Sequence, residues 1–314
     1  MREDATSDPL ETVRDRGQIT RRSATWNIVH AMDESAAGSG AQSIHRALTL
    51  LNLLGVMARD RPDGVTLADL AHVSGRPKAS VHRVLNALVQ LGYAERIEPS
   101  GRYRLGLQSQ ILGELAGERT DPLLRLASPS LVRIAELSED TTFLTVRQGS
   151  FSLCARREEG FGEIRNNALA VGDRHPLGVG AGSLAILAAL EDAEVEHVIE
   201  VNGEIMSRRY PRISADVLRG IVDRTRRDGY ALNEGLVAPG SWAVAVIINV
   251  PGRGPTAALS VASIEPRLSG ARRDELVAVM KKEASVIEAS LANQQHDEGA
   301  GPVSPRAQAP RRTS

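Results

Sequence analysis

The chain has 314 residues, of which 42% are hydrophobic and 25% charged, and this length and composition suggest two domains with a sizeable apolar core. The formal net charge is −1, from 38 Lys and Arg residues against 39 Asp and Glu residues, so any affinity for nucleic acid must come from a local patch. The longest apolar runs, residues 183–190 and 242–250, are far shorter than the roughly 20 residues of a membrane helix, which excludes a membrane-spanning protein.

The first and last segments differ in composition from the rest. Residues 1–41 show no sustained apolar period and end in small residues, and residues 293–314 are polar and carry three prolines. Such sequences bury too little apolar surface to fold, so we expect a disordered N-terminal extension and a disordered tail. The first residues lack the features of a secretory signal, and Cys154 has no second cysteine for a disulfide. We therefore expect the protein in the cytoplasm, associated with the nucleoid.

Residues 42–119 carry 10 basic and 7 acidic side chains, which makes this segment basic. Apolar residues at helical spacing predict a first helix over 43–58. Thr66 can cap a short helix over 67–73, because its hydroxyl accepts from the first free backbone N–H groups. Pro77 suits the first turn of a third helix, which Gly92 ends. The sequence predicts three short helices here.

The third helix has one apolar and one polar face. Its apolar stripe consists of Val81, Val84, Leu85 and Leu88. Arg83 and Asn86 lie on the opposite face, and their side chains suit bidentate hydrogen bonds to guanine and adenine, respectively. The candidate DNA-contacting residues of this helix and the turn before it are Arg76, Lys78, Ser80, His82, Arg83 and Asn86.

A basic hairpin is predicted directly after this helix. Residues 93–106 form two short alternating stretches around a Pro-Ser-Gly turn. Arg102 and Arg104 lie where such a wing could contact a neighbouring groove or backbone of DNA. A small helical subdomain with a solvated charged face is the alternative. The basic excess, the glycine-containing turn and the hairpin together favour DNA binding.

The second half mixes helices and strands. Helical periods are seen over 106–118, which would bridge two domains, and then over 121–139, 214–229 and 271–292. Alternating stretches over 141–150, 151–159, 242–250 and 257–265 predict strands. Trp242 should point to the sheet face opposite Ala243 and pack in the core. This order fits an α+β sandwich around an antiparallel sheet.

QSIHRALTLLNLLG, TLADLAHVSGRPKASVHRVLNALVQLGYAER and SGRYRLG together resemble the IclR family of bacterial transcription regulators, and the likeness covers roughly residues 42–292. The resemblance implies a winged helix-turn-helix domain over 42–105, with residues 66–85 as the helix-turn-helix. It further implies a linker helix over 106–120 and a GAF-like effector-binding domain over 121–292. The implied partners are double-stranded operator DNA, a small-molecule effector and the protein itself, as a homodimer or a dimer of dimers. No cofactor or metal is implied.

The resemblance also implies where an effector would bind. The polar positions of the family's pocket correspond here to Asn233, Ala243, Ser260 and Ala262, and three of the four differ from the family pattern. The small residues Gly180, Ala181 and Gly182 would form a pocket loop at a helix N-terminus. We therefore expect an effector larger or less polar than a small keto acid. The alternative is a domain that has lost ligand binding and only oligomerises.

Other classes of function receive less support. Ser183 lacks the strand-turn-helix motif of a hydrolase nucleophile, and Cys154 is expected to be a buried thiol. His175 lies beside the pocket loop and could contact an effector, but we expect a loop histidine with its hydrogen bonds satisfied. The glycine-rich run nominally matches a dinucleotide fingerprint, but no parallel strand-helix-strand pattern surrounds it. A purely DNA-bending protein would not need the second domain. We therefore expect no enzyme but a DNA-binding regulator on a pseudo-palindromic site.

Overall fold

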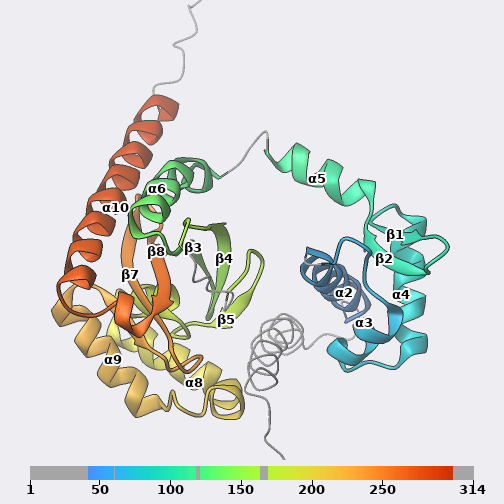
Figure 1. Cartoon of the computed structure of the whole chain (residues 1–314), viewed down its shortest axis with the longest axis horizontal. Coiled ribbons are helices and arrows are strands. Elements are labelled where there is room, and N and C mark those ends of the chain that lie inside the picture. The colour runs from blue at the N-terminus through green and yellow to red at the C-terminus, as the bar shows by residue number, and fades with distance from the viewer. Residues whose placement is uncertain (1–41, 60, 118–120, 163–168, 300–314) are drawn as a thin grey trace, which may run out of the picture.

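The structure is a computed structural model that describes residues 42–59, 61–117, 121–162 and 169–299, with side chains described to residue 294 (Figure 1). The expected disordered segment 1–41 and most of the expected tail lie outside the described residues. The first unit contains α2 (Gln42–Arg59), α3 (Leu67–Ser74), α4 (Lys78–Gln90), β1 (Ala94–Ile97) and β2 (Arg102–Leu105). These are the three helices and the hairpin that the sequence predicts.

Local signals in the sequence set the boundaries of these helices. The Thr66 hydroxyl accepts a hydrogen bond from the backbone N–H of Asp69 at 3.1 Å and caps α3. Gly75 ends α3 in the left-handed conformation, with φ of 64°, which glycine adopts without strain. Leu53, Leu85 and Tyr103 are buried together and join α2, α4 and the hairpin in one core.

Helix α5 (Leu107–Gly117) leads from the hairpin towards the second unit, as Figure 1 shows. None of its residues is buried. Four of its apolar side chains are exposed, namely Leu107, Ile111, Leu112 and Leu115. The helix therefore has an apolar surface that the described part of the chain leaves uncovered.

The second unit is built on one antiparallel sheet with the strand order β5-β4-β3-β8-β7-β6. Its strands are β3 (Thr141–Gln148), β4 (Phe151–Glu158), β5 (Arg174–Pro176), β6 (Ala231–Glu234), β7 (Ser241–Val250) and β8 (Gly254–Ile264). Its helices are α6 (Pro122–Ser138), α7 (Ala181–Ala188), α8 (Asp192–Arg209), α9 (Ala215–Asp228) and α10 (Gly270–Gly299). The sandwich around an antiparallel sheet is thus confirmed.

Helices cover both faces of this sheet (Figure 1). Helices α6 and α10 pack on one face, against Leu144, Val244 and Leu259. Helices α7, α8 and α9 share a second core on the other face, with Ala245 and Ala258. Because successive side chains of a strand point to opposite faces, each strand contributes to both cores. Trp242 packs on the α6 and α10 side, as its neighbour Ala243 predicts.

The structure also corrects the sequence-based expectations. The closing helix, expected to end at residue 292, continues to Gly299, so the expected tail of 293–314 begins inside α10. The added residues include two Gln and one Glu, which are good helix formers, and the polarity of this segment had suggested disorder. Three elements, β5, α8 and β6, were not predicted, and of α7 the sequence indicated only the N-terminus, at residues 180–182. In the described ranges, no helix is both long and apolar enough to span a bilayer.

Candidate nucleic-acid interface and ligand cavity

Helix α4 buries its apolar stripe and exposes the polar face expected to contact DNA. Val81, Leu85 and Leu88 are buried. Lys78, His82, Arg83 and Asn86 are exposed, whereas Ser80 and Arg76 are half-buried. Among the described residues, Arg83 and Asn86 form no ion pair or side-chain hydrogen bond within the chain. Their donors are therefore available to an external partner.

The two wing arginines are held within the hairpin. Arg104 donates two hydrogen bonds of 3.0 Å to the carboxylate of Glu95, which lies opposite it in the β1–β2 ladder. Arg102 is half-buried, and its Nη1 donates to the carbonyl oxygen of Gly64 at 3.2 Å. The sequence placed both on the wing but could not show these partners. A third wing arginine, Arg96, was overlooked; it is exposed and lies 3.5 Å from Glu98.

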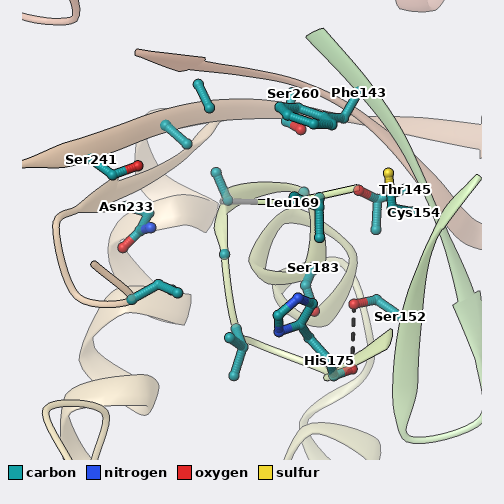
Figure 2. A pocket seen from close by; sticks show the side chains of 17 residues that line it. Phe143, Thr145, Ser152, Cys154, Leu169, His175, Ser183, Asn233, Ser241 and Ser260 are labelled. Carbon is teal, nitrogen blue, oxygen red and sulfur yellow. Dashed lines mark hydrogen bonds between the residues drawn. The ribbon is translucent and has the colours of Figure 1, made fainter. Parts of the chain in front are cut away.

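All seven candidate effector residues line one cavity between the sheet and α7 (Figure 2). They are Gly180, Ala181, Gly182, Asn233, Ala243, Ser260 and Ala262. The cavity volume is about 70 Å³. The sequence did not indicate several other lining residues, among them Phe143, Thr145, Ser152 and Ser241. Cys154 was expected only as a buried thiol, and His175 as a loop histidine beside the pocket; both line the cavity.

Strand alternation explains why these distant residues meet. Ser260 on β8 pairs with Phe143 on β3 and with Ala245 on β7. Paired residues of neighbouring strands project from the same face of a sheet, so these three side chains all point towards α7. Asn233 on β6 pairs with Ala243 on β7, so both residues lie on this same face of the sheet. Since β6 is an edge strand, Asn233 lies at the edge of the sheet. Alternating short side chains such as Ala243 leave room that a larger residue would fill.

Gly182 brings α7 close to the floor of the sheet. A Cβ atom at this position would lie 2.6 Å from the Thr145 Oγ1 atom and 3.0 Å from its Cβ atom. Gly180 precedes α7 with φ of 82°, a conformation that L side chains rarely adopt. The N-terminal backbone N–H groups of α7 therefore border the cavity, where a helix can bind a negatively charged or polar acceptor group.

The cavity lining is mainly apolar, and it carries no Asp, Glu, Lys or Arg side chain among the described residues. The Asn233 side-chain oxygen accepts from the Leu236 N–H at 3.2 Å, and its amide nitrogen makes no hydrogen bond to described residues. The Ser183 hydroxyl accepts from the Gly178 N–H and donates to the Pro176 carbonyl, so it supports the loop. Hydroxyl, amide and imidazole groups are thus the nitrogen and oxygen donors among the side chains that a ligand would meet.

His175 forms the lower wall of the cavity in Figure 2 and lies in strand β5 rather than in a loop. Its Nδ1 atom is 3.0 Å from the Tyr210 hydroxyl. Burial, with a smaller contribution from Arg209, lowers the pKa of His175 to about 4, so the ring is neutral at pH 7. Cys154 is buried, as the sequence predicts, and burial raises the pKa of its thiol to about 12, so the thiol form predominates at pH 7.

A buried carboxyl group lies beside the cavity, where the two units touch. The Asp173 Oδ2 atom accepts from the Ala170 N–H at 2.8 Å, and burial raises the pKa of this carboxyl to about 6. Arg59, at the end of α2, donates to the Val171 carbonyl at 2.5 Å. Helix α2 of the first unit thus contacts Val171, which is two residues from the cavity-lining residue Leu169.

Two family models match the chain. The model described as "Bacterial transcriptional regulator IclR C-terminal" matches residues 119–289, and "IclR helix-turn-helix domain" matches residues 43–98. The curated protein "HTH-type transcriptional regulator KipR" of Bacillus subtilis is 27% identical over 246 residues, which cover 78% of this chain and 95% of that protein. The matched regions include both the α4 surface and the cavity.

Solved structures show the same arrangement. An ICLR transcriptional regulator from Silicibacter sp. TM1040 is 25% identical, with a TM-score of 0.61 over 79% of this chain and 96% of that chain. An IclR homolog from Microbacterium hydrocarbonoxydans, in complex with 4-hydroxybenzoate, is 24% identical, with a TM-score of 0.61 over 80% of this chain and 99% of that chain. Both likenesses span the two units.

Proposed function

The chain belongs to the IclR family of bacterial transcriptional regulators, and from this premise we propose that it reads its operator through the exposed face of α4. The observation that carries the proposal is the pair Arg83 and Asn86, which are exposed, one turn apart, and have no side-chain partner among the described residues. Arg83 would donate to guanine and Asn86 would pair with adenine in the major groove. Lys78, Ser80 and His82 would contact the phosphates or neighbouring bases.

The wing has a smaller role in this proposal. Arg104 would have to leave the carboxylate of Glu95 to bind a phosphate, whereas Arg102 helps to hold the hairpin against the Gly64 loop. An exposed ion pair is worth only about 0–1 kcal/mol, so DNA phosphates can compete for Arg104. We therefore assign recognition to α4 and a backbone contact to the wing.

The second unit would adjust DNA binding in response to a small organic ligand in the cytoplasm. We assign the ligand's acceptor group to the N-terminus of α7, and its apolar part to Phe143 and Val179. The cavity of about 70 Å³ does not support the expectation of a bulky effector, since an engineered cavity that binds benzene has about 150 Å³. A compact, weakly polar organic acid fits best. The proposal assigns no catalytic residue.

A ligand here could act on the first unit through two connections. One is helix α5, and the other is the contact of Arg59 with the Val171 carbonyl beside Asp173. A ligand changes operator occupancy only to the extent that it binds the DNA-competent and incompetent forms differently. The contact between α2 and residues 171–172 is a place where these two forms could differ.

We further propose that the protein binds DNA as a homodimer. Leu107, Leu112 and Leu115 on α5 are between 46% and 68% exposed, and Ile44 and Leu48 on α2 are at least half exposed. So many exposed apolar side chains on two helices are typical of a protein–protein interface. A two-fold symmetric dimer would read two half-sites about one helical turn apart.

Fluorescence anisotropy on DNA from beside the protein's own gene tests the recognition surface. Arg83→Ala should weaken sequence-selective binding by roughly five- to 150-fold, because a good bidentate base contact contributes about 1–3 kcal/mol. The matched control is Arg227→Ala, which removes an exposed arginine from α9 in the second unit. Equal loss in both variants, or selective binding retained by Arg83→Ala, would contradict the assignment.

The ligand assignment needs a separate titration. Acetate, pyruvate and benzoate, added to the protein–DNA complex, distinguish a compact acid from a ring-sized one. We expect the smaller acids to shift operator affinity and Ala243→Leu, which fills the cavity, to abolish the shift. An unchanged affinity with every acid would instead support a second unit that only oligomerises.

A further inference from the structure

A second and larger cavity lies in the second unit, between α8 and the N-terminal part of α9, and the proposed function does not use it. Its volume is about 310 Å³, against about 70 Å³ for the cavity at the sheet. The N-terminal part of α9, α8 and Leu177 surround it. We propose that this α8–α9 cavity is a second ligand site, for a single-ring aromatic molecule with one hydroxyl or N–H donor.

The walls of the α8–α9 cavity are mainly aliphatic. Leu177, Val198 and Leu218 are each no more than 2% exposed and form its floor, and Ile199 and Met206 are also buried. An engineered apolar cavity of about 150 Å³ binds benzene, so a volume of about 310 Å³ accommodates a ring with a substituent. Burial of the ring against these side chains supplies the driving force for binding.

One buried polar group can orient the ring. Asn202 is 2% exposed, lines the cavity, and donates from Nδ2 to the Ser150 carbonyl at 2.8 Å. This hydrogen bond fixes the amide group, and the Asn202 Oδ1 atom makes no hydrogen bond to the described residues. A hydroxyl or N–H group on the ligand would donate to this oxygen, so the site favours a donor over a carboxylate.

The two cavities share one wall, which is the segment from His175 to Val179. His175 and Val179 line the cavity at the sheet, and Leu177 between them lines the α8–α9 cavity. Tyr210 lines the α8–α9 cavity, and its hydroxyl is 3.0 Å from His175 Nδ1. Leu218 packs against Gly178, where a Cβ atom would lie 3.0 Å from its side chain. A ligand that displaces Tyr210 or Leu218 therefore moves the wall of the first cavity.

Gly203 offers a way to close the site without disturbing its walls. It lies in α8 at the edge of the cavity, and a Cβ atom there meets nothing within 4 Å. Because Gly203 is exposed at this edge, Gly203→Leu should place a side chain across the opening of the cavity. Gly220→Leu on α9 is the matched control, since Gly220 is also helical, exposed and open to a Cβ atom, but does not line the cavity.

Titration of the full chain with 4-fluorophenol, followed by ¹⁹F NMR, tests the site. We expect saturable binding in the wild type and in Gly220→Leu, and at least roughly tenfold weaker binding in Gly203→Leu. 4-Fluoroanisole, which lacks the donor, should bind roughly tenfold more weakly, because it leaves Asn202 Oδ1 without a partner. Binding that is absent, equally lost in both variants, or unchanged in Gly203→Leu overturns the proposal.

The coupling between the two cavities through the shared wall is tested by a separate NMR measurement. Binding of 4-fluorophenol should shift the imidazole NMR signals of His175, and Tyr210→Phe should reduce this shift while the probe still binds. An unperturbed His175 signal at saturation would refute the coupling. The site does not depend on the proposed function, because neither measurement involves DNA.

Discussion

Replacing Asp173 by Asn should change how the stability of the second unit depends on pH. Burial raises the pKa of this carboxyl from its usual 3.8 to about 6, against the opposing effects of the Ala170 N–H and of Arg59 and Arg157. Between pH 3.8 and about pH 6, the Asp173 carboxyl of the folded protein keeps a proton that the same group of the unfolded chain has released. The free energy of unfolding therefore falls as the pH rises through this window.

The size of the effect follows from the two pKa values. A difference of about 2 pKa units at about 1.4 kcal/mol per unit gives about 3 kcal/mol, fully developed above pH 6. Asn has no charge at any pH, and its side-chain oxygen can still accept from the Ala170 N–H. Because the unfolded carboxyl is already about half ionised at pH 4, Asp173→Asn should gain about 2.5 kcal/mol of unfolding free energy relative to wild type between pH 4 and pH 7.5, in addition to any constant offset.

Urea unfolding of both proteins at pH 4 and pH 7.5, at constant ionic strength and followed by circular dichroism, measures this difference. Titration of other groups, His175 included, occurs in both proteins and cancels in the comparison. A stability difference that is the same at both pH values would refute the reasoning, because it would mean that the Asp173 carboxyl is not held in its neutral form by burial.

Three further predictions concern other residues. His175, with a pKa lowered from 6.5 to about 4, should destabilise the fold by up to about 3 kcal/mol as the pH falls through this window, and NMR titration should show its ring neutral above pH 5. Gly182→Ala should lower the free energy of unfolding by about 1–3 kcal/mol, because its Cβ would overlap Thr145, whereas Gly220→Ala should raise it by up to about 1 kcal/mol; equal effects would contradict the close approach of α7. Leu115→Glu should shift the mass measured by light scattering from dimer towards monomer, and an unchanged mass would exclude α5 from the interface.

The sequence alone determined the features that depend on local order. The apolar stripe of α4 places Arg83 and Asn86 outward whatever the rest of the chain does, because helical geometry fixes which residues share a face. The Thr66 cap, the hairpin and most of the long helices and strands of the second unit were likewise predicted, since caps, turns and periodicity involve neighbouring residues.

The tertiary structure decided what distant residues do together. Strand pairing brings Thr145, His175 and Ser260 to one cavity from segments far apart in the chain, and no local pattern encodes that register. The pairing of Arg104 with Glu95 likewise depends on which residues face each other across β1 and β2. Cavity volumes depend on packing from every side, so only the folded chain showed that the cavity at the sheet is small and the α8–α9 cavity is large.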